Sequence, residues 1–233
     1  MDKISIIVPC FNEEDVVSMF YQETTKQLHR IPDIDYELLF INDGSKDHTA
    51  SVLKELAEKD SHCFYFTFSR NFGKEAAMFA GLEKATGDYV VIMDADLQHP
   101  PRLLPDMYHA CKYEGYDCAA GKRVDRTGEG RLRNFLSHSF YKVIQKLTKM
   151  DMDDGAGDFR MMSRQMVDAI LELKEYNRYM KGLFSFVGFD TKWIEFHNVE
   201  RAAGQTKWNF TSLFSYAFKG IFSFSATPIT FAG

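Results

Sequence analysis

Short apolar runs alternate with segments of helical periodicity through the first half of this 233-residue chain. Such alternation over short connections builds an open, mostly parallel α/β sheet with right-handed crossovers, and we predict that fold class. The expected strands are residues 5–8, 36–41, 64–68, 87–93 and 117–121, with helices at 14–29, from 47–49 to about 56, 75–85 and 102–113. Further strand-like runs are expected at 157–162 and 193–199.

Polar loops follow four of the predicted strands, at residues 9–14, 42–47, 70–74 and 94–99. In a parallel sheet the carboxyl ends of the strands meet at one edge, where ligands bind. We therefore expect all four loops to line the same edge. The chain contains neither Gly-x-Gly-x-x-Gly after its first strand nor Gly-x-x-x-x-Gly-Lys-Ser/Thr, which disfavours Rossmann dinucleotide binding and P-loop chemistry.

Asp94 and Asp96 follow the fourth predicted strand with one residue between them. Two carboxylates so placed suit Mg²⁺ or Mn²⁺ bridging a diphosphate, because these ions take one or two carboxylates plus substrate phosphates. Taken alone, Asp-x-Asp is more often an ordinary acidic turn. The three neighbouring loops and the missing Gly-rich motifs favour a nucleotide diphosphate held through a metal ion.

Length and composition predict one large domain, or one domain with an appendage, because 45% of the residues are hydrophobic. The four cysteines show no metal-ligand spacing, which is typical of reduced thiols in a cytosolic protein. The apolar run near the N-terminus is too short for a signal peptide. The cysteines are Cys10, Cys63, Cys111 and Cys118.

The net charge of −5 conceals two basic segments. Residues 122–150 carry eight Lys or Arg against two Asp or Glu, and residues 201–233 carry three against none. Residues 131–149 have the pattern of a basic amphipathic helix, either a solvated face over a core or a membrane-surface helix. The Phe-rich pattern of residues 210–222 favours a membrane interface over a core helix. No nucleic-acid recognition motif accompanies these charges.

Five motifs in order resemble glycosyltransferase family 2, and the likeness covers essentially the whole chain. Within that family, RNFGK together with DADLQ resembles the polyisoprenyl-phosphate glycosyltransferases. The resemblance implies an inverting enzyme of the GT-A fold that moves a sugar from a nucleotide-diphosphate donor to a polyprenyl phosphate. Likeness to the bacterial branch implies that the donor is a UDP-sugar. The motifs are IVPCFNEE (7–14), NDGSKDHT (42–49), SRNFGKEAA (69–77), DADLQHPP (94–101) and GDFRMM (157–162).

The resemblance also implies roles for individual residues on the donor side. Asp94 and Asp96 hold the Mg²⁺ or Mn²⁺ ion on the diphosphate, with Gln98 beside them. The nucleotide-sugar site is completed by Pro9, Phe11, Glu13, Asp43, Lys74 and Ala95. Asn42 stands where relatives often carry an acid.

On the catalytic and acceptor side, Arg201 and Lys207 are implied to neutralise the phosphates or the leaving group. The lipid phosphate is received by Arg123, Arg133 and Ser137. The resemblance implies that Asp158 orients or activates the acceptor. We favour orientation over proton removal, because a phosphate nucleophile is already anionic and needs a strong base less than a hydroxyl does.

We expect a catalytic domain over residues 1–207, which contains the acceptor helix 131–149. An amphipathic juxtamembrane segment is expected over residues 208–233. Membrane spans are expected beyond it in a longer parent protein. The resemblance places the enzyme at the cytoplasmic face of the plasma membrane and allows homo-oligomers. Two alternatives are a processive polysaccharide synthase, which would want a Gln-x-x-Arg-Trp motif that is absent here, and a non-catalytic nucleotide-sugar or membrane-binding module.

Overall fold

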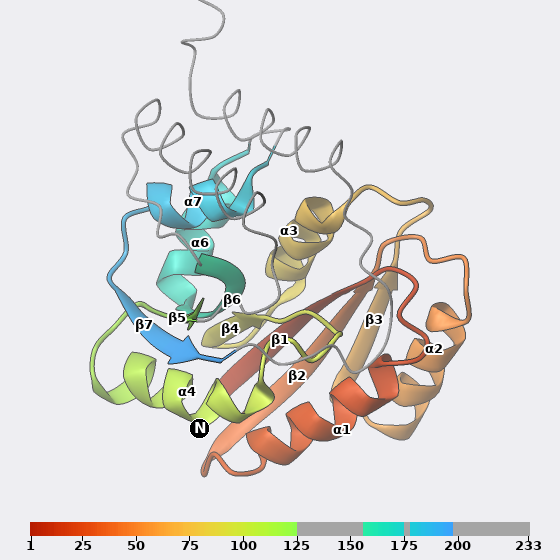
Figure 1. Cartoon of the computed structure of the whole chain (residues 1–233), viewed down its shortest axis with the longest axis horizontal. Helices are drawn as coiled ribbons and strands as arrows, with labels where there is room; N and C mark the ends of the chain where they lie inside the picture. Colours follow the sequence, from red (N-terminus) through yellow and green to blue (C-terminus); the bar gives the residue numbers. More distant parts are fainter. Residues whose placement is uncertain (125–155, 175–177, 198–233) are drawn as a thin grey trace, which may run out of the picture.

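The computed structural model describes residues 1–124, 156–174 and 178–197, which form a seven-stranded sheet between helices (Figure 1). The strand order is β3-β2-β1-β4-β6-β5-β7. Strands β1 to β4 are parallel, β6 runs antiparallel to both β4 and β5, and β7 is parallel to β5. The predicted, mostly parallel α/β sheet is thereby confirmed. The strands are β1 (Asp2–Cys10), β2 (Ile34–Asn42), β3 (Cys63–Thr67), β4 (Tyr89–Ile92), β5 (Cys118–Arg123), β6 (Ala156–Ser163) and β7 (Thr191–Phe196).

The four helices predicted in the first half are present, with shifted boundaries. The first begins at Val17 rather than near residue 14, because the residues before it form the loop that contacts residues 45–49. Two helices in the second half, α6 and α7, were not predicted. The helices are α1 (Val17–Leu28), α2 (Thr49–Lys59), α3 (Lys74–Lys84), α4 (Leu104–Tyr113) after a 3₁₀ turn η1 (Pro101–Leu103), α6 (Arg164–Glu172) and α7 (Met180–Phe186).

Apolar side chains on the two faces of the sheet form two separate cores. Along β1, Ile4, Ile6 and Val8 pack with the side chains of α1, α2 and α4, whereas Ile7 packs with α3 on the other face. Successive residues of a strand point to opposite faces, so a strand covered on both sides is apolar throughout. Figure 1 shows α1 and α4 below the sheet, with α3 and α7 above it.

Helix α3 packs closely against the sheet at Gly81. A Cβ atom on Gly81 would come within 2.2 Å of the Ile7 Cγ2 atom, so only glycine permits this approach. The helix starts at Lys74, directly after the loop that follows β3. The close packing of α3 therefore fixes where Lys74 stands at the carboxyl edge of the sheet.

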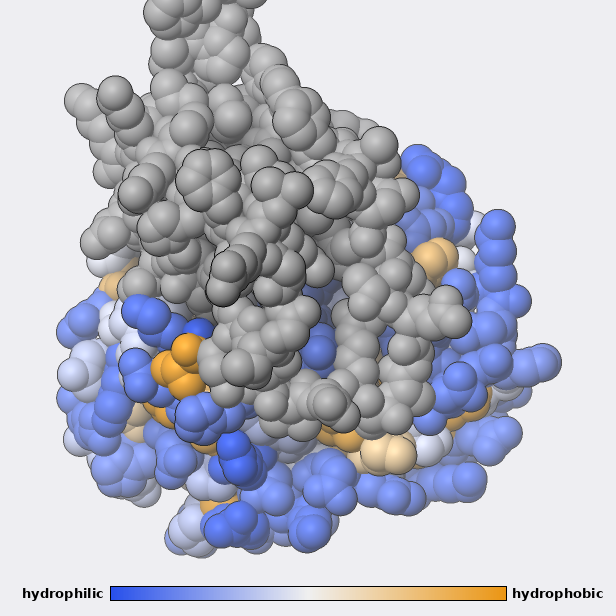
Figure 2. Space-filling view, in the orientation of Figure 1, coloured by the Kyte–Doolittle hydropathy of each residue, from blue (hydrophilic) through white to orange (hydrophobic). Residues whose placement is uncertain are grey.

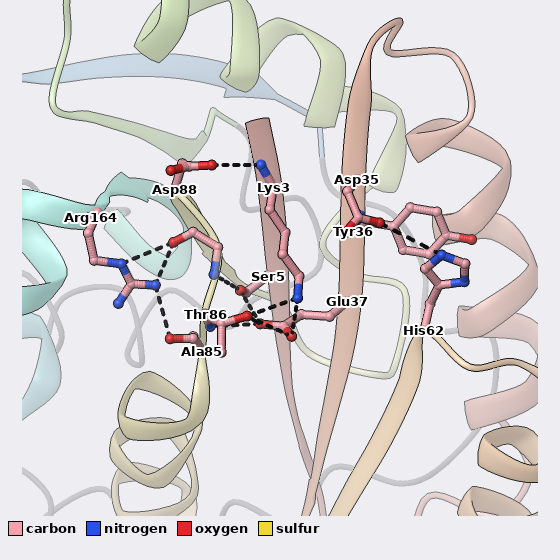
Figure 3. Close-up of polar contacts among 11 residues, drawn as sticks. Lys3, Ser5, Asp35, Tyr36, Glu37, His62, Ala85, Thr86, Asp88 and Arg164 are labelled. Atoms are coloured by element: carbon pink, nitrogen blue, oxygen red, sulfur yellow. Dashed lines mark hydrogen bonds and ion pairs between the residues drawn. The ribbon is translucent and has the colours of Figure 1, made fainter. Parts of the chain in front are cut away.

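A polar network joins β1, β2 and the start of β4 near their amino ends (Figure 3). The Glu37 carboxylate, which is 4% exposed, accepts hydrogen bonds from Ser5 Oγ at 2.6 Å and from the Thr86 amide at 2.7 Å. It also forms an ion pair with Lys3 Nζ at 2.9 Å. Arg164, at the start of α6, donates to the carbonyl oxygens before β4. The network fixes the end of the sheet that lies opposite the predicted site.

The described surface on the side seen in Figure 2 is mainly hydrophilic, with scattered apolar side chains. No helix within residues 1–124, 156–174 and 178–197 is both long enough and apolar enough to cross a bilayer. The predicted amphipathic segments 131–149 and 210–222 and the predicted domain boundary after residue 207 lie outside the described residues.

Candidate active site at the carboxyl edge of the sheet

The loops that follow β1 and β2 are joined by direct hydrogen bonds. The Asn12 amide donates to Ser45 Oγ at 2.9 Å, and Asn12 Oδ1 accepts from the Lys46 amide at 2.8 Å. The Glu13 amide donates to Thr49 Oγ1 at 2.9 Å. These contacts confirm that the first two loops meet at one edge of the sheet, as the strand order requires.

Asp43 connects the second loop to the third. Its carboxylate accepts the Phe72 amide at 2.6 Å and the Gly73 amide at 2.9 Å. Burial raises the pKa of Asp43, while these two amide hydrogen bonds act in the opposite direction. Each carboxylate oxygen of Asp43 therefore holds the backbone just before α3. Its implied contact with a nucleoside stays a prediction.

A lysine and two carboxylates from three different elements meet at the centre of this edge. Lys74 Nζ lies 2.7 Å from Asp94 Oδ1 and 2.9 Å from Asp94 Oδ2, and 2.7 Å from Asp158 Oδ2. Lys74 begins α3, Asp94 follows β4, and Asp158 lies within β6. The β4–β6 register pairs Ile92 with Arg160, so its antiparallel continuation brings Asp94 opposite Asp158. We call these three residues the Lys74 cluster.

The charges within the Lys74 cluster keep its members ionised. Burial alone would raise the pKa of Asp158, but the positive charges of Lys74 and Lys181 lower it far below the usual value. Burial also opposes the charged form of Asp94, and the positive charge of Lys74 outweighs it, so the pKa of Asp94 is lowered too. Lys74 itself has a raised pKa because the two carboxylates outweigh its burial. At neutral pH, Asp158 is therefore a poor proton acceptor.

The backbone between Asp94 and His99 is held by two local contacts. Asp96 Oδ1 accepts the Gln98 amide at 3.1 Å, a side-chain turn that places Leu97 in the left-handed region at φ 59°. His99 Nδ1 accepts the Asp94 amide at 3.0 Å, and the imidazole stacks on the Phe159 ring with the centroids 5.0 Å apart. Burial lowers the pKa of His99, so the ring is neutral and carries its proton on Nε2.

The oxygen ligands at this edge fit a divalent cation shared with a diphosphate. Asp94 and Asp96 offer hard carboxylate oxygens, which Mg²⁺ and Mn²⁺ prefer. Among the described residues, no donor reaches the buried Oδ1 atom of Asp158, which leaves one more acceptor beside the pair. The described part of the chain holds no group of three or more His, Cys, Asp or Glu that could bind a metal alone. Phosphate oxygens would have to complete the coordination.

The other implied site residues are distributed as follows. Pro9 and Phe11 are half-buried at the end of β1, and Ala95 is buried. Arg123 is the last residue of β5 and lies at the same edge, because β5 is parallel to β4 through their shared neighbour β6. The structure does not describe Arg133, Ser137, Arg201 or Lys207.

Two residues near the Lys74 cluster were missed in the sequence. His99 lies within the DADLQHPP motif, five residues after Asp94, and that position was a usable signal. Lys181 is half-buried in α7, and its charge lowers the pKa of Asp158 although the two residues are far apart in the chain. Nothing in the local sequence indicates that second contribution.

Comparison with known proteins identifies the family. The family model for Glycosyl transferase family 2 matches residues 5–171. The putative glycosyltransferase CsbB of Bacillus subtilis is 47% identical over 97% of this chain and 68% of its own length. The bactoprenol glucosyl transferase of Shigella phage SfV is 42% identical over 97% of this chain and 73% of its own length.

Among solved structures, glucosyl-3-phosphoglycerate synthase from Mycobacterium tuberculosis, in complex with Mn²⁺, UDP-glucose and phosphoglyceric acid, superposes with a TM-score of 0.56. It is 20% identical, and the match covers 94% of this chain and 77% of that one. This likeness supports the fold, with the GT-A arrangement of sheet and helices. The chain described here belongs to glycosyltransferase family 2 and is a glycosyltransferase of the GT-A fold.

Proposed function

We propose that this chain transfers a sugar, with inversion, from a UDP-sugar to a polyprenyl phosphate at the cytoplasmic face of the membrane. The observation that carries the proposal is the Lys74 cluster, which adjoins the Asp96 turn at the carboxyl edge of the sheet. The name of the Shigella phage relative supports a polyprenyl acceptor. The UDP-glucose in the mycobacterial structure supports a UDP-sugar donor.

On the donor side, Asp94 and Asp96 would hold a Mg²⁺ or Mn²⁺ ion, with Gln98 beside them. When bound, such an ion neutralises the charge that develops on a departing nucleoside diphosphate. Pro9, Phe11 and Glu13 would contact the nucleoside from the end of β1, where the structure holds their loop against residues 45–49. Asp43 would act mainly by fixing the start of α3, since its oxygens accept the amides there.

On the acceptor side, the nucleophile would be an oxygen of the lipid phosphate. That oxygen is anionic at neutral pH and needs no strong base. The low pKa of Asp158 supports an orienting role for this carboxylate instead of proton removal. Arg123, at the end of β5, would receive the phosphate together with Arg133 and Ser137. Arg201 and Lys207 would neutralise the leaving group.

A donor screen tests this proposal directly. The purified chain would be incubated with undecaprenyl phosphate in detergent and with labelled UDP-glucose, UDP-GlcNAc, UDP-galactose or GDP-mannose, each with Mg²⁺ and with Mn²⁺. We expect lipid-linked sugar from one UDP-sugar, with no product when EDTA is present. Lipid products are resolved by thin-layer chromatography and mass spectrometry.

Two variants complete the screen. Asp96→Asn should reduce transfer by a hundredfold or more, on the order of the loss of one charge-stabilising group in an active site. Asp168→Asn removes an exposed acid of α6 and serves as the matched control, with unchanged activity expected. Full activity with EDTA or in Asp96→Asn would contradict the metal assignment. No lipid product from any donor would contradict the proposed reaction.

The same proposal assigns residues 131–149 and 210–222 to contact with the membrane surface. Co-sedimentation with vesicles tests that assignment separately from catalysis. Binding to vesicles containing phosphatidylglycerol, and much weaker binding to pure phosphatidylcholine, is expected for basic amphipathic segments. Equal recovery with both vesicle types would argue against an electrostatic contribution.

A further inference from the structure

We propose that Lys74 makes divalent-cation binding depend on the nucleotide, because its ammonium group holds the carboxylate that the cation needs and releases it only when a diphosphate is present. This inference rests on the donor side of the proposed function and adds a residue that controls the order in which the site is filled. Lys74 is a positioning residue here, since it acts through Asp94 and Asp158.

The first argument is that carboxylate oxygens already occupy all the hydrogen-bond donors of the Lys74 ammonium group. An ammonium carries three N–H donors. Three carboxylate oxygens lie within 2.7 to 2.9 Å of Lys74 Nζ, two from Asp94 and one from Asp158. Both oxygens of Asp94 are therefore in contact with a cation that the protein itself supplies. A divalent ion that approached Asp94 alone would meet a like charge already in place.

The second argument is that the end of the Lys74 side chain can move while its backbone stays in place. The backbone before it is fixed by the amides of Phe72 and Gly73 on Asp43. The body of α3 is fixed by the close contact between Gly81 and Ile7. The Lys74 side chain, in contrast, is 36% exposed, so its end can turn toward a ligand while α3 stays in place.

The third argument is that the buried Asp158 carboxylate must keep its ion pair with Lys74. Asp158 is almost fully buried, its side chain being 10% exposed, and a buried carboxylate without a counter-charge is strongly unfavourable. Lys74 can keep its contact with Asp158 and exchange Asp94 for an oxygen of a diphosphate. The exchange frees Asp94 for the divalent ion, and the ion and the diphosphate then attract each other. Cation and nucleotide binding become linked through one ammonium group.

Mn²⁺ titration in the absence of lipid tests this linkage without any activity measurement. Free Mn²⁺ would be followed by electron paramagnetic resonance with and without UDP. For the unchanged chain we expect weak binding of Mn²⁺ alone and at least a tenfold gain in affinity when UDP is present. Linkage requires Mn²⁺ to strengthen UDP binding by the same factor, which calorimetry measures independently.

The informative variant is Lys74→Met, which keeps an unbranched side chain one atom shorter and removes its charge. We expect it to bind Mn²⁺ alone at least tenfold more tightly than the unchanged chain, and the gain from UDP to shrink to less than threefold. Lys84→Met is the matched control, because Lys84 is exposed and lies at the far end of the same helix. This control should behave like the unchanged chain.

Removal of Lys74 takes away the ammonium group that contacts both Asp94 and Asp158, and this loss can impair folding. The double variant Lys74→Met/Asp158→Asn removes one negative charge together with the positive one, and thermal unfolding checks that it is folded. It too should bind Mn²⁺ tightly without UDP. Equal Mn²⁺ affinities for the unchanged chain and both variants would overturn the inference. A failed donor screen with intact Mn²⁺–UDP linkage would instead count against the proposed transfer reaction alone.

Discussion

At the scale of single residues, His99 shows how the position of Asp94, a candidate metal ligand, depends on a neighbouring side chain. The imidazole accepts the backbone amide of Asp94 and stacks on Phe159, which belongs to β6. It thereby connects the loop after β4 to the strand that carries Asp158. The position of the Asp94 carboxylate is consequently set from both sides, by Lys74 through its charge and by His99 through the backbone.

Replacing His99 by Phe should separate these two contributions. The change keeps an aromatic ring for the stack on Phe159 but removes the acceptor for the Asp94 amide. A buried amide left without a partner costs about 1–3 kcal/mol, and we expect the free energy of unfolding to fall by that amount. Urea unfolding provides the measurement.

His109→Phe is the control for this prediction, because the His109 side chain is exposed on α4 and its loss should change stability by roughly 0.5 kcal/mol or less. Similar stability of the His99→Phe variant and the unchanged chain would mean that the Asp94 amide finds another acceptor.

At the scale of elements, helix α3 determines the geometry of the Lys74 cluster. Its first residue supplies the ammonium group, and its middle residue Gly81 sets the distance between the helix and β1. Any change that lifts α3 from the sheet would also move Lys74 away from Asp94. Packing on one face of the sheet is therefore directly connected to electrostatics at its edge.

Gly81→Ala tests this connection. The added methyl group would overlap the Ile7 side chain, so we expect a loss of about 1–3 kcal/mol in the free energy of unfolding, as for other overpacked cores. In a double-mutant cycle, Ile7→Ala removes the overlapping methyl group. The loss of unfolding free energy in the double variant should therefore be smaller than the sum of the losses in the two single variants. Strict additivity would show that α3 accommodates the methyl group without contact with Ile7.

The sequence predicted the elements that carry local signals and missed those that depend on distant partners. The apolar runs of β1, β2 and β4 are covered on both faces, so their pattern was recognisable. Helix α6 also has a local signal, since Ser163 caps it by accepting the Met166 amide, but it lies in a stretch without regular alternation. The antiparallel insertion of β6 between β4 and β5 has no local signature at all.

The same distinction applies to the candidate site. Asp94 and Asp96 were predicted because they follow a recognisable strand, and Lys74 because it lies in one of the motifs that resemble the family. The contacts of Lys74 with Asp94 and with Asp158 join residues 20 and 84 positions apart in the chain, which no periodicity reports. The low pKa of Asp158 depends on that contact and could be derived only from the folded structure.

At the scale of the whole molecule, polar clusters fix the sheet at both ends. The Lys74 cluster lies at the carboxyl edge, and the Glu37 network lies near the amino ends of β1 and β2. Burial alone would raise the pKa of Glu37, but hydrogen bonds from Ser5 and Thr86, together with Lys3, lower it below the usual 4.5. The folded chain therefore favours the ionised form of Glu37 more strongly than the unfolded chain does.

The consequence is a measurable dependence of stability on pH. A carboxyl group whose pKa is lowered by folding contributes its full stabilisation above the unfolded value of 4.5, and loses it as the pH falls through the folded value. Glu37→Gln should thus flatten the decline in the free energy of unfolding below about pH 5, as measured by urea unfolding at several pH values. Parallel curves for variant and unchanged chain would show that Glu37 titrates alike in both states.

The central place of β6 also bears on how the chain emerges from the ribosome. Domains generally fold as units as translation proceeds. A nascent chain that ends near residue 124 already contains β5, yet within the described part of the chain β5 pairs only with β6 and β7. Until β6 has been translated, β5 has no neighbour and β4 presents an open edge. Asp158 lies on β6, so translation of this one strand completes both the centre of the sheet and the Lys74 cluster.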